Sequence, residues 1–379
     1  MSEGKKGDDT RDKNMTSVDS KDIRINEPDD AITDVSLRVC KVLDNISQTQ
    51  CSNTYSVQLA SLIVNGLYSG FDGSADVEFQ LVGSVGEGCP IISSSKLSDH
   101  DLMYVMNTCQ AYEHSVVCVP KPHWQFYIEQ CDINPCYVRL RALTRGSSPK
   151  LFNNLPGIFS FESKLGGHYL SNAIPATMNN LFALPTFEFL KEEKIVAGPS
   201  LTHTVTGLSP YNTVDTVISI RCHAWPAVAE EWINRRRYYH WPFRCFIEEH
   251  VKHGCHVVPV GCKECEHTYL DWRLSFVLVE QALVSEFNAT QLKCYLLLKH
   301  LKKFTFEDEI DYMISSYILK TTLFWVIEES PPDLWVPRRL LTAVQICLDR
   351  LITAIRTDFC PNYFIRNSNL FARRYKVVE

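Results

Sequence analysis

The sequence has no long uninterrupted run of apolar residues. No stretch approaches the roughly 20 apolar residues that a membrane-spanning helix needs. No basic segment followed by a short apolar run opens the chain, as a secretory signal would require. The sequence therefore predicts a soluble, unsecreted protein without a membrane partner, and we expect it in the cytoplasm.

The sequence also has no excess of positive charge and no regular frame of cysteines. The formal net charge of −6 excludes a uniformly basic surface, so a nucleic-acid partner would have to bind a local basic patch. The 15 cysteines are odd in number, in a chain of 379 residues that is long enough to fold without disulfides. We therefore expect reduced thiols.

Three regions differ in composition, and none contains an internal repeat. Residues 1–30 are polar and predict a disordered tail. Residues 31–224 begin with helical spacing of apolar residues and continue with candidate strands, at 77–82, 102–106, 115–119, 126–131, 137–143 and 214–220. Residues 225–379 show helical periodicity, at 272–287, 290–304, 310–329 and 338–357. The pattern predicts a bilobed α+β fold, with a mixed sheet lobe and a helical C-terminal lobe.

Three aspartates stand at the heads of candidate strands. Asp99 and Asp101 are two residues apart and point to the same face if one strand includes both. Asp215 opens the segment "VDTVISI", and a Gly83-Ser84 turn follows the strand at 77–82. Neighbouring carboxylates repel unless a cation lies between them. The pattern favours a nucleotidyltransferase that uses two divalent ions, Mg²⁺ or Mn²⁺, although ordinary acids at turns remain the alternative.

Each of these residue types suits one part of that chemistry. Asp99 and Asp101 would bridge two metal ions, one on the donor triphosphate and one that lowers the pKa of the attacking hydroxyl. Asp215 would ligate the second ion and accept the proton from that hydroxyl. Gly83 lets backbone N–H groups approach a phosphate, and Ser84 adds a hydroxyl donor.

Further motifs follow in the second half of the chain, namely "GPSLT" and "HAWP" on either side of Asp215, then "WRLSF", "CYLLLK", "SSYILKT" and "NYFIRNSNLF". With the Gly-Ser turn and the acidic pair, these motifs resemble the cyclic GMP-AMP synthase-like receptors of the male-abnormal-21 nucleotidyltransferase superfamily, over about residues 59–371. The resemblance implies that Arg273 and Ser275 contact a nucleotide base and that Lys299 contacts the nucleotide. It places Ser316 and Tyr317 on the family's serine and base-stacking tyrosine.

The resemblance implies an enzyme of innate immune sensing that joins ATP with GTP, or other nucleoside triphosphates, into a cyclic dinucleotide. Val277 stands where the family has a second serine, which leaves the nucleotide pair open. Residues 280–291 contain no cysteine or histidine, so the zinc loop of the vertebrate DNA sensor is absent. We therefore expect double-stranded RNA as the activator before double-stranded DNA, with a homodimer as a possible liganded state. A non-catalytic scaffold and a linear template-independent oligonucleotide synthase are the alternatives.

Other polar clusters leave two interpretations open. The Cys262-x-x-Cys265 pair, with histidines at 250, 253, 256 and 267, could hold zinc, but reduced thiols are favoured. Residues 235–237 are three arginines that either contact phosphate or pair with Glu230, Glu231, Glu248 or Glu249. Candidate residues for a nucleic-acid platform are Arg38, Lys41, Arg139, Arg141, Arg145, Lys150 and the basic residues at 299–303.

Overall fold

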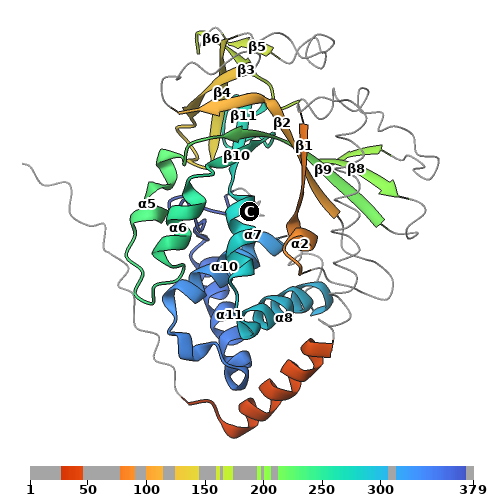
Figure 1. Ribbon diagram of the computed structural model, residues 1–379, viewed down its shortest axis with the longest axis vertical. Helices are drawn as coiled ribbons and strands as arrows, with labels where there is room; N and C mark the ends of the chain where they lie inside the picture. Colours follow the sequence, from red (N-terminus) through yellow and green to blue (C-terminus); the bar gives the residue numbers. More distant parts are fainter. Residues whose placement is uncertain are drawn as a thin grey trace, which may run out of the picture.

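The computed structural model describes residues 27–45, 77–89, 100–113, 124–144, 159–162, 165–173, 194–197, 200–205, 212–305 and 313–372. A sheet lies at one end of the molecule and the helices α8, α10 and α11 lie at the other, with α7 between them (Figure 1). The α+β class expected from the sequence is confirmed. Within the described part of the chain, no helix is both long enough and apolar enough to cross a membrane.

The strands are β1 (Val77–Val82), β2 (His100–Tyr112), β3 (Trp124–Gln130), β4 (Tyr137–Thr144), β5 (Phe159–Glu162), β6 (Gly167–Leu170), β7 (Lys194–Ala197), β8 (Ser200–Val205), β9 (Asn212–Cys222), β10 (Cys255–Val258) and β11 (Asp271–Ser275). The helices are an N-terminal helix at residues 30–45, α2 (Gly83–Gly86), α5 (Glu230–Asn234), α6 (Arg244–Val251), α7 (Val277–Ser285), α8 (Ala289–Thr305), α10 (Ser316–Glu329) and α11 (Leu340–Arg356).

All the strands belong to one sheet, with the hydrogen-bonded order β1-β2-β3-β4-β11-β10-β9-β8-β7 and the hairpin β5-β6 attached to β4. β2 also pairs in parallel with β9. The hydrogen-bonded path from β2 through β3, β4, β11, β10 and β9 therefore returns to β2. The sheet therefore brings strands from residue 77 to residue 275 into one body, and it places β10 and β11 between β4 and β9.

The two faces of this sheet have different surroundings. On β9, Ile218 and Ile220 pack into the main hydrophobic core, so the alternating residues Asp215 and Arg221 project to the opposite face. The strand register shows which residues of the neighbouring strands lie on this second face, because the side chains of paired residues point to the same side of the sheet. Arg221 is paired with His256 of β10, and His256 is paired with Ser275 of β11. We call this second face, defined by Asp215, Arg221, His256 and Ser275, the polar face of the sheet.

The described strands confirm the sequence prediction at 77–82, 126–131, 137–143 and 214–220, apart from one or two end residues, and the strand predicted at 102–106 is confirmed but extends six residues further, to Tyr112. The candidate strand at 115–119 lies outside the described residues. The helix expected over 272–287 is wrong at its beginning, because Asp271–Ser275 forms β11 and the helix begins at Val277. Trp272 and Leu274 alternate with Arg273, as in a strand. This segment pairs with β4 on one side and with β10 on the other, and these pairings favour the strand over the helix.

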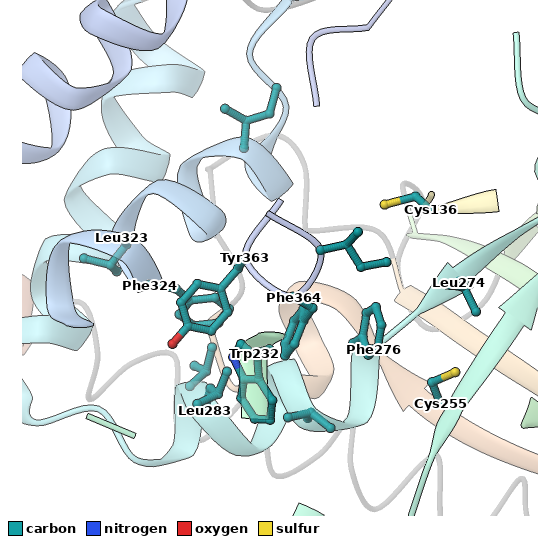
Figure 2. Close-up of a cluster of buried hydrophobic side chains, with 14 of the residues drawn as sticks. Cys136, Trp232, Cys255, Leu274, Phe276, Leu283, Leu323, Phe324, Tyr363 and Phe364 are labelled. Atoms are coloured by element: carbon teal, nitrogen blue, oxygen red, sulfur yellow. The ribbon is translucent and has the colours of Figure 1, made fainter. Parts of the chain in front are cut away.

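An aromatic cluster joins the sheet to the helices. Phe276 follows β11 directly and stacks on Phe364 with ring centroids 4.5 Å apart, and Trp232 lies 5.2 Å from Phe364. Figure 2 shows these rings together with Tyr363 and Phe324 of the helical side. Such aromatic pairs add about 0.5–1.5 kcal/mol beyond the burial of their area. The cluster therefore fixes the position of β11 relative to the C-terminal helices.

A buried ion pair supports the same junction. Glu328 of α10 accepts a hydrogen bond from Arg235 at 2.7 Å and lies 3.3 Å from Arg237 Nε. The Tyr363 hydroxyl donates to the same carboxylate at 2.7 Å. Arg235 and Arg237 are thus occupied inside the protein, mainly by a glutamate that the sequence interpretation did not consider, while Arg236 is exposed.

We predict that Glu328→Gln destabilises the protein by roughly 3–5 kcal/mol, because it leaves two buried guanidinium groups without their carboxylate. The Arg235 and Glu328 side chains are only 4% and 5% exposed. The control Glu248→Gln removes a pair with Arg244 whose side chains are 58% and 61% exposed, and it should change the free energy of unfolding by about 0.5 kcal/mol or less. Equal unfolding free energies for the two variants in urea would contradict the structural role.

Candidate active site

Two of the three predicted acids lie side by side. Asp101 of β2 and Asp215 of β9 are direct register partners on adjacent parallel strands, so both carboxylates project from the polar face of the sheet. Both residues are half-buried. Asp99 lies outside the described residues, so its expected place beside Asp101 stays a prediction.

The Gly-Ser turn lies against the same acid. β1 ends at Val82, which pairs with Asp101, and α2 begins at Gly83. Gly83 has a φ of +65°, and a Cβ added there would lie only 2.0 Å from Asp101 Oδ2. Glycine is therefore required twice at this position, for the left-handed backbone and for the approach of the carboxylate.

The helical lobe contributes a lysine to this turn. Lys299 of α8 is buried, and its Nζ donates to Ser84 Oγ at 2.9 Å and to the Cys89 carbonyl. Burial lowers the pKa of Lys299 from its usual value, the ammonium of Lys320 adds to this effect, and Asp101 is among the negative charges that oppose it. The structure thus brings together Gly83, Ser84, Asp101 and Lys299, as the sequence analysis expected.

A second buried lysine, which the sequence analysis missed, holds the turn in place. Lys320 of α10 forms ion pairs with Glu87, directly after α2, at 2.5 Å and with Glu280 of α7 at 2.7 Å. Burial alone would lower the pKa of Lys320, but the carboxylates of Glu280 and Glu87 outweigh it and raise the pKa above its usual value. Tyr295 also donates to Glu87, at 3.1 Å. No spacing in the sequence indicates that these four residues meet.

Thr202 is another residue that the sequence analysis did not single out. It is the register partner of Asp215 on β8, and its hydroxyl donates to Asp215 Oδ1 at 2.5 Å. The hydrogen bond fixes the orientation of the carboxylate and leaves its other oxygen for a further ligand. Its position in the "GPSLT" motif was the available signal.

The predicted base-contacting residues lie on two elements. Arg273 is exposed and Ser275 half-buried, and by the strand register both side chains belong to the polar face. Tyr317 is half-buried near the beginning of α10, with its hydroxyl accepting from Asn362 at 3.2 Å. Burial raises the pKa of Tyr317 and the positive charge of Arg273 lowers it, so the two side chains are near enough to interact. Ser316, the first residue of α10, is half-buried beside Tyr317.

The acids fit a divalent metal ion. Asp101 and Asp215 are hard oxygen donors on one face, and the absence of a side chain at Gly83 lets the Asp101 carboxylate lie against the turn. Oxygen-only donors at a strand pair match the preference of Mg²⁺, which keeps several waters and substrate oxygens in its coordination shell. Among the described residues these two carboxylates are the donors available at the turn, and Asp99 is the expected third.

A sheet bearing paired acids next to a Gly-Ser turn, closed by a helical lobe that supplies a lysine, defines a protein of the nucleotidyltransferase class. Residues 171–286 match the Mab-21 protein nucleotidyltransferase domain, and residues 290–377 match the Mab-21 protein HhH/H2TH-like domain. The chain belongs to the Mab-21 family, which confirms the superfamily inferred from the motifs. Asp215, Arg273 and Ser275 lie within the first match and Lys299, Ser316 and Tyr317 within the second, while Gly83, Ser84, Asp99 and Asp101 precede both.

We predict that Gly83→Ala disrupts the site and that Gly88→Ala does not. Both glycines have positive φ values, +65° and +70°, but a Cβ at Gly88 meets no atom within 4 Å. Both variants should lose about 1 kcal/mol of stability from backbone strain. Only Gly83→Ala should also lose Mg²⁺-dependent nucleotide binding, measured by calorimetry. Equal binding by the two variants would show that the contact with Asp101 is unimportant.

The polar face also carries a buried histidine. His256 is 2% exposed and its Nε2 has no hydrogen-bond partner. Burial, with smaller contributions from the charges of Arg221 and His223, lowers the pKa of His256 from 6.5 to about 4. Because the folded state disfavours protonation, stability is complete above pH 6.5 and falls as the pH drops toward 4.

We predict that acidification from pH 6.5 to pH 4 reduces the stability of the wild-type protein by about 3 kcal/mol through this residue. His256→Asn should have a flatter pH profile in chemical denaturation over this range. The control His253→Asn changes an exposed histidine and should keep the wild-type slope. An unchanged slope in His256→Asn would contradict the assignment.

Proposed function

We propose that this protein joins two nucleoside triphosphates into a cyclic dinucleotide second messenger of innate immune sensing and that a nucleic acid activates it. The observation that supports the proposal most directly is the pairing of Asp101 with Asp215, beside a Gly-Ser turn that Lys299 contacts from the helical lobe. Two carboxylates in register beside this turn supply oxygen ligands for a divalent ion, which a scaffold protein does not need. The nucleotidyltransferase domain match agrees with this chemistry.

Asp101 and Asp215, with Asp99, would hold Mg²⁺. When bound, Mg²⁺ supplies charge neutralisation on the triphosphate and lowers the pKa of the attacking hydroxyl. Asp215 would accept the proton of that hydroxyl through Oδ2, because Thr202 occupies Oδ1. Ser84 and Lys299 would bind phosphate oxygens from the side of the turn, with the Lys299 ammonium already directed at Ser84 Oγ.

The base would lie between the two lobes. The half-buried Tyr317 ring offers a stacking surface, and the exposed Arg273 guanidinium can form two parallel hydrogen bonds with a purine edge. Ser275 and Ser316 add hydroxyl groups. Val277 cannot form the hydrogen bond of the family serine, which leaves the nucleotide pair open. We propose ATP with GTP as the first pair to test, with other nucleoside triphosphates included.

Double-stranded RNA is the activator that we propose first. Of the candidate platform residues, Arg38, Arg139 and Arg141 are paired with Asp34, Asp271 and Glu129, respectively, and Arg145 and Lys150 lie outside the described residues. A hollow of about 180 Å³ on the polar face is lined by Arg221, His223, Lys252, His253 and Leu278. Its basic side chains suit a phosphate backbone, and a homodimer on RNA is part of the proposal.

We predict that the protein, given labelled nucleoside triphosphates with Mg²⁺ or Mn²⁺ and double-stranded RNA, forms a phosphatase-resistant dinucleotide, resolved by chromatography. Asp101→Asn and Asp215→Asn should each lower the rate by at least about 1,000-fold, since each removes a metal ligand. The control Asp349→Asn changes an exposed acid on α11 and should keep the wild-type rate.

The products distinguish the alternatives. A ladder of phosphatase-sensitive oligonucleotides would establish a linear synthase, and a product made only with double-stranded DNA would replace RNA as the activator. Wild-type activity in Asp101→Asn would overturn the metal site. Folded protein that neither reacts nor binds nucleotide with Mg²⁺ would favour a scaffold.

A further inference from the structure

Three cysteines from distant parts of the chain meet at one point. Cys131 directly follows β3, and Cys262 and Cys265 lie in the connection between β10 and β11. Their sulfur atoms all lie within 4.8 Å of one another, and they are the one such group of three or more potential metal ligands in the described part of the chain. The sequence showed only the Cys262-x-x-Cys265 pair, and none of the four nearby histidines joins the group.

The three thiols are shielded from solvent and are not joined by a disulfide. Cys131, Cys262 and Cys265 are 3%, 1% and 8% exposed, with the Tyr137 ring packed against them. The sulfur atoms of Cys131 and Cys265 are 3.0 Å apart, well beyond the roughly 2.05 Å of a disulfide bond. Three thiolates on one zinc ion stand about 3.8 Å apart, as tetrahedral geometry with Zn–S bonds of about 2.3 Å requires. Small side-chain rotations would bring these atoms to that spacing.

The Cys262-x-x-Cys265 turn brings its two thiols together. The Cys265 N–H donates to the Cys262 carbonyl at 3.3 Å and closes a tight turn. Pairs of cysteines at this spacing commonly ligate one zinc ion, and here the fold adds Cys131 as a third thiol.

The charge around the cluster also suits a cation with three thiolates. Three thiolates and one Zn²⁺ ion have a net charge of −1, which is costly in a buried site unless a positive group is near. Arg139 is near, and it pairs with Asp271 at 3.0 Å. Burial lowers the pKa of Arg139, but the negative charge of Asp271 raises it, and Cys131 and Cys265 contribute smaller effects in the same direction as Asp271. The guanidinium that pairs with Asp271 is thus near enough to the thiols for their charges to interact.

We propose that Cys131, Cys262 and Cys265 are three ligands of a zinc site that stabilises the fold. Soft thiolate sulfurs select zinc over Mg²⁺, which prefers oxygen, so this ion is distinct from the one at Asp101 and Asp215. The site would tie the β3–β4 turn to the segment leading into β11. Because β11 carries Arg273 and Ser275, zinc would hold the base-contacting strand in register with β4.

The test uses the full chain, purified without chelator and without a nickel column. We expect about one zinc ion per chain by elemental mass spectrometry. Cys131→Ala, Cys262→Ala and Cys265→Ala should each reduce zinc content at least tenfold, and chelation of the wild type should lower its melting temperature. The control Cys136→Ala removes a buried thiol from the same β3–β4 turn but outside the group, and it should keep the zinc.

Cobalt substitution gives a readout that does not depend on whether a variant folds. Wild-type protein loaded with Co²⁺ should show sulfur-to-cobalt charge-transfer absorption in the near ultraviolet, with an intensity that corresponds to three thiolates. Folded wild-type protein with less than about 0.1 equivalent of zinc and no such absorption would overturn the proposal. A Cys131–Cys265 disulfide in freshly prepared protein, found by non-reducing peptide mapping, would overturn it as well.

Discussion

The buried ammonium of Lys320, held between Glu87 and Glu280, is the interaction on which the arrangement of the site depends. It joins α10 to α7 and to the residue that follows the Gly-Ser turn. Two buried carboxylates without this cation would each carry a large desolvation cost. Since apolar residues of similar volume can replace such a group without loss of stability, we infer that its value here is geometric. It fixes the distance between the Gly-Ser turn and the helical lobe. No single helix or strand connects these two parts of the site.

That constraint explains how residues from both lobes serve one substrate. Lys299 reaches Ser84 from α8, and Lys320 Nζ lies 5.6 Å from the centre of the Tyr317 ring. The Gly-Ser turn and the Tyr317 ring are thus both contacted by lysines of the helical lobe, from α8 and α10. A shift of α10 relative to α2 would therefore disturb both parts of the candidate site together.

The sequence was sufficient for features that depend on local pattern, and insufficient for those that depend on register. Alternation predicted β1 at its true bounds, and a Gly-Ser pair after it identified the turn. The acids at strand heads predicted that Asp101 and Asp215 belong to one site, although not that they are register partners. In contrast, the partners of Lys320, the hydrogen bond of Thr202 and the meeting of Cys131 with Cys262 arise from pairings between residues far apart in sequence. β11 was mistaken for helix because its five residues fit both periods, and only its neighbours β4 and β10 decide between them.

β11 shows how much function rests on one short strand. A five-residue strand has little stability of its own, yet it carries the exposed Arg273, which we propose as a base-contacting residue. The structure secures it at both ends. Asp271 at its beginning is fully buried and paired with Arg139 of β4, and Phe276 after its end is stacked on Phe364. With the cysteine cluster in the segment before it, every side of β11 except the polar face is fixed. Arg273, the proposed base contact, is the one side chain of this strand that is left exposed.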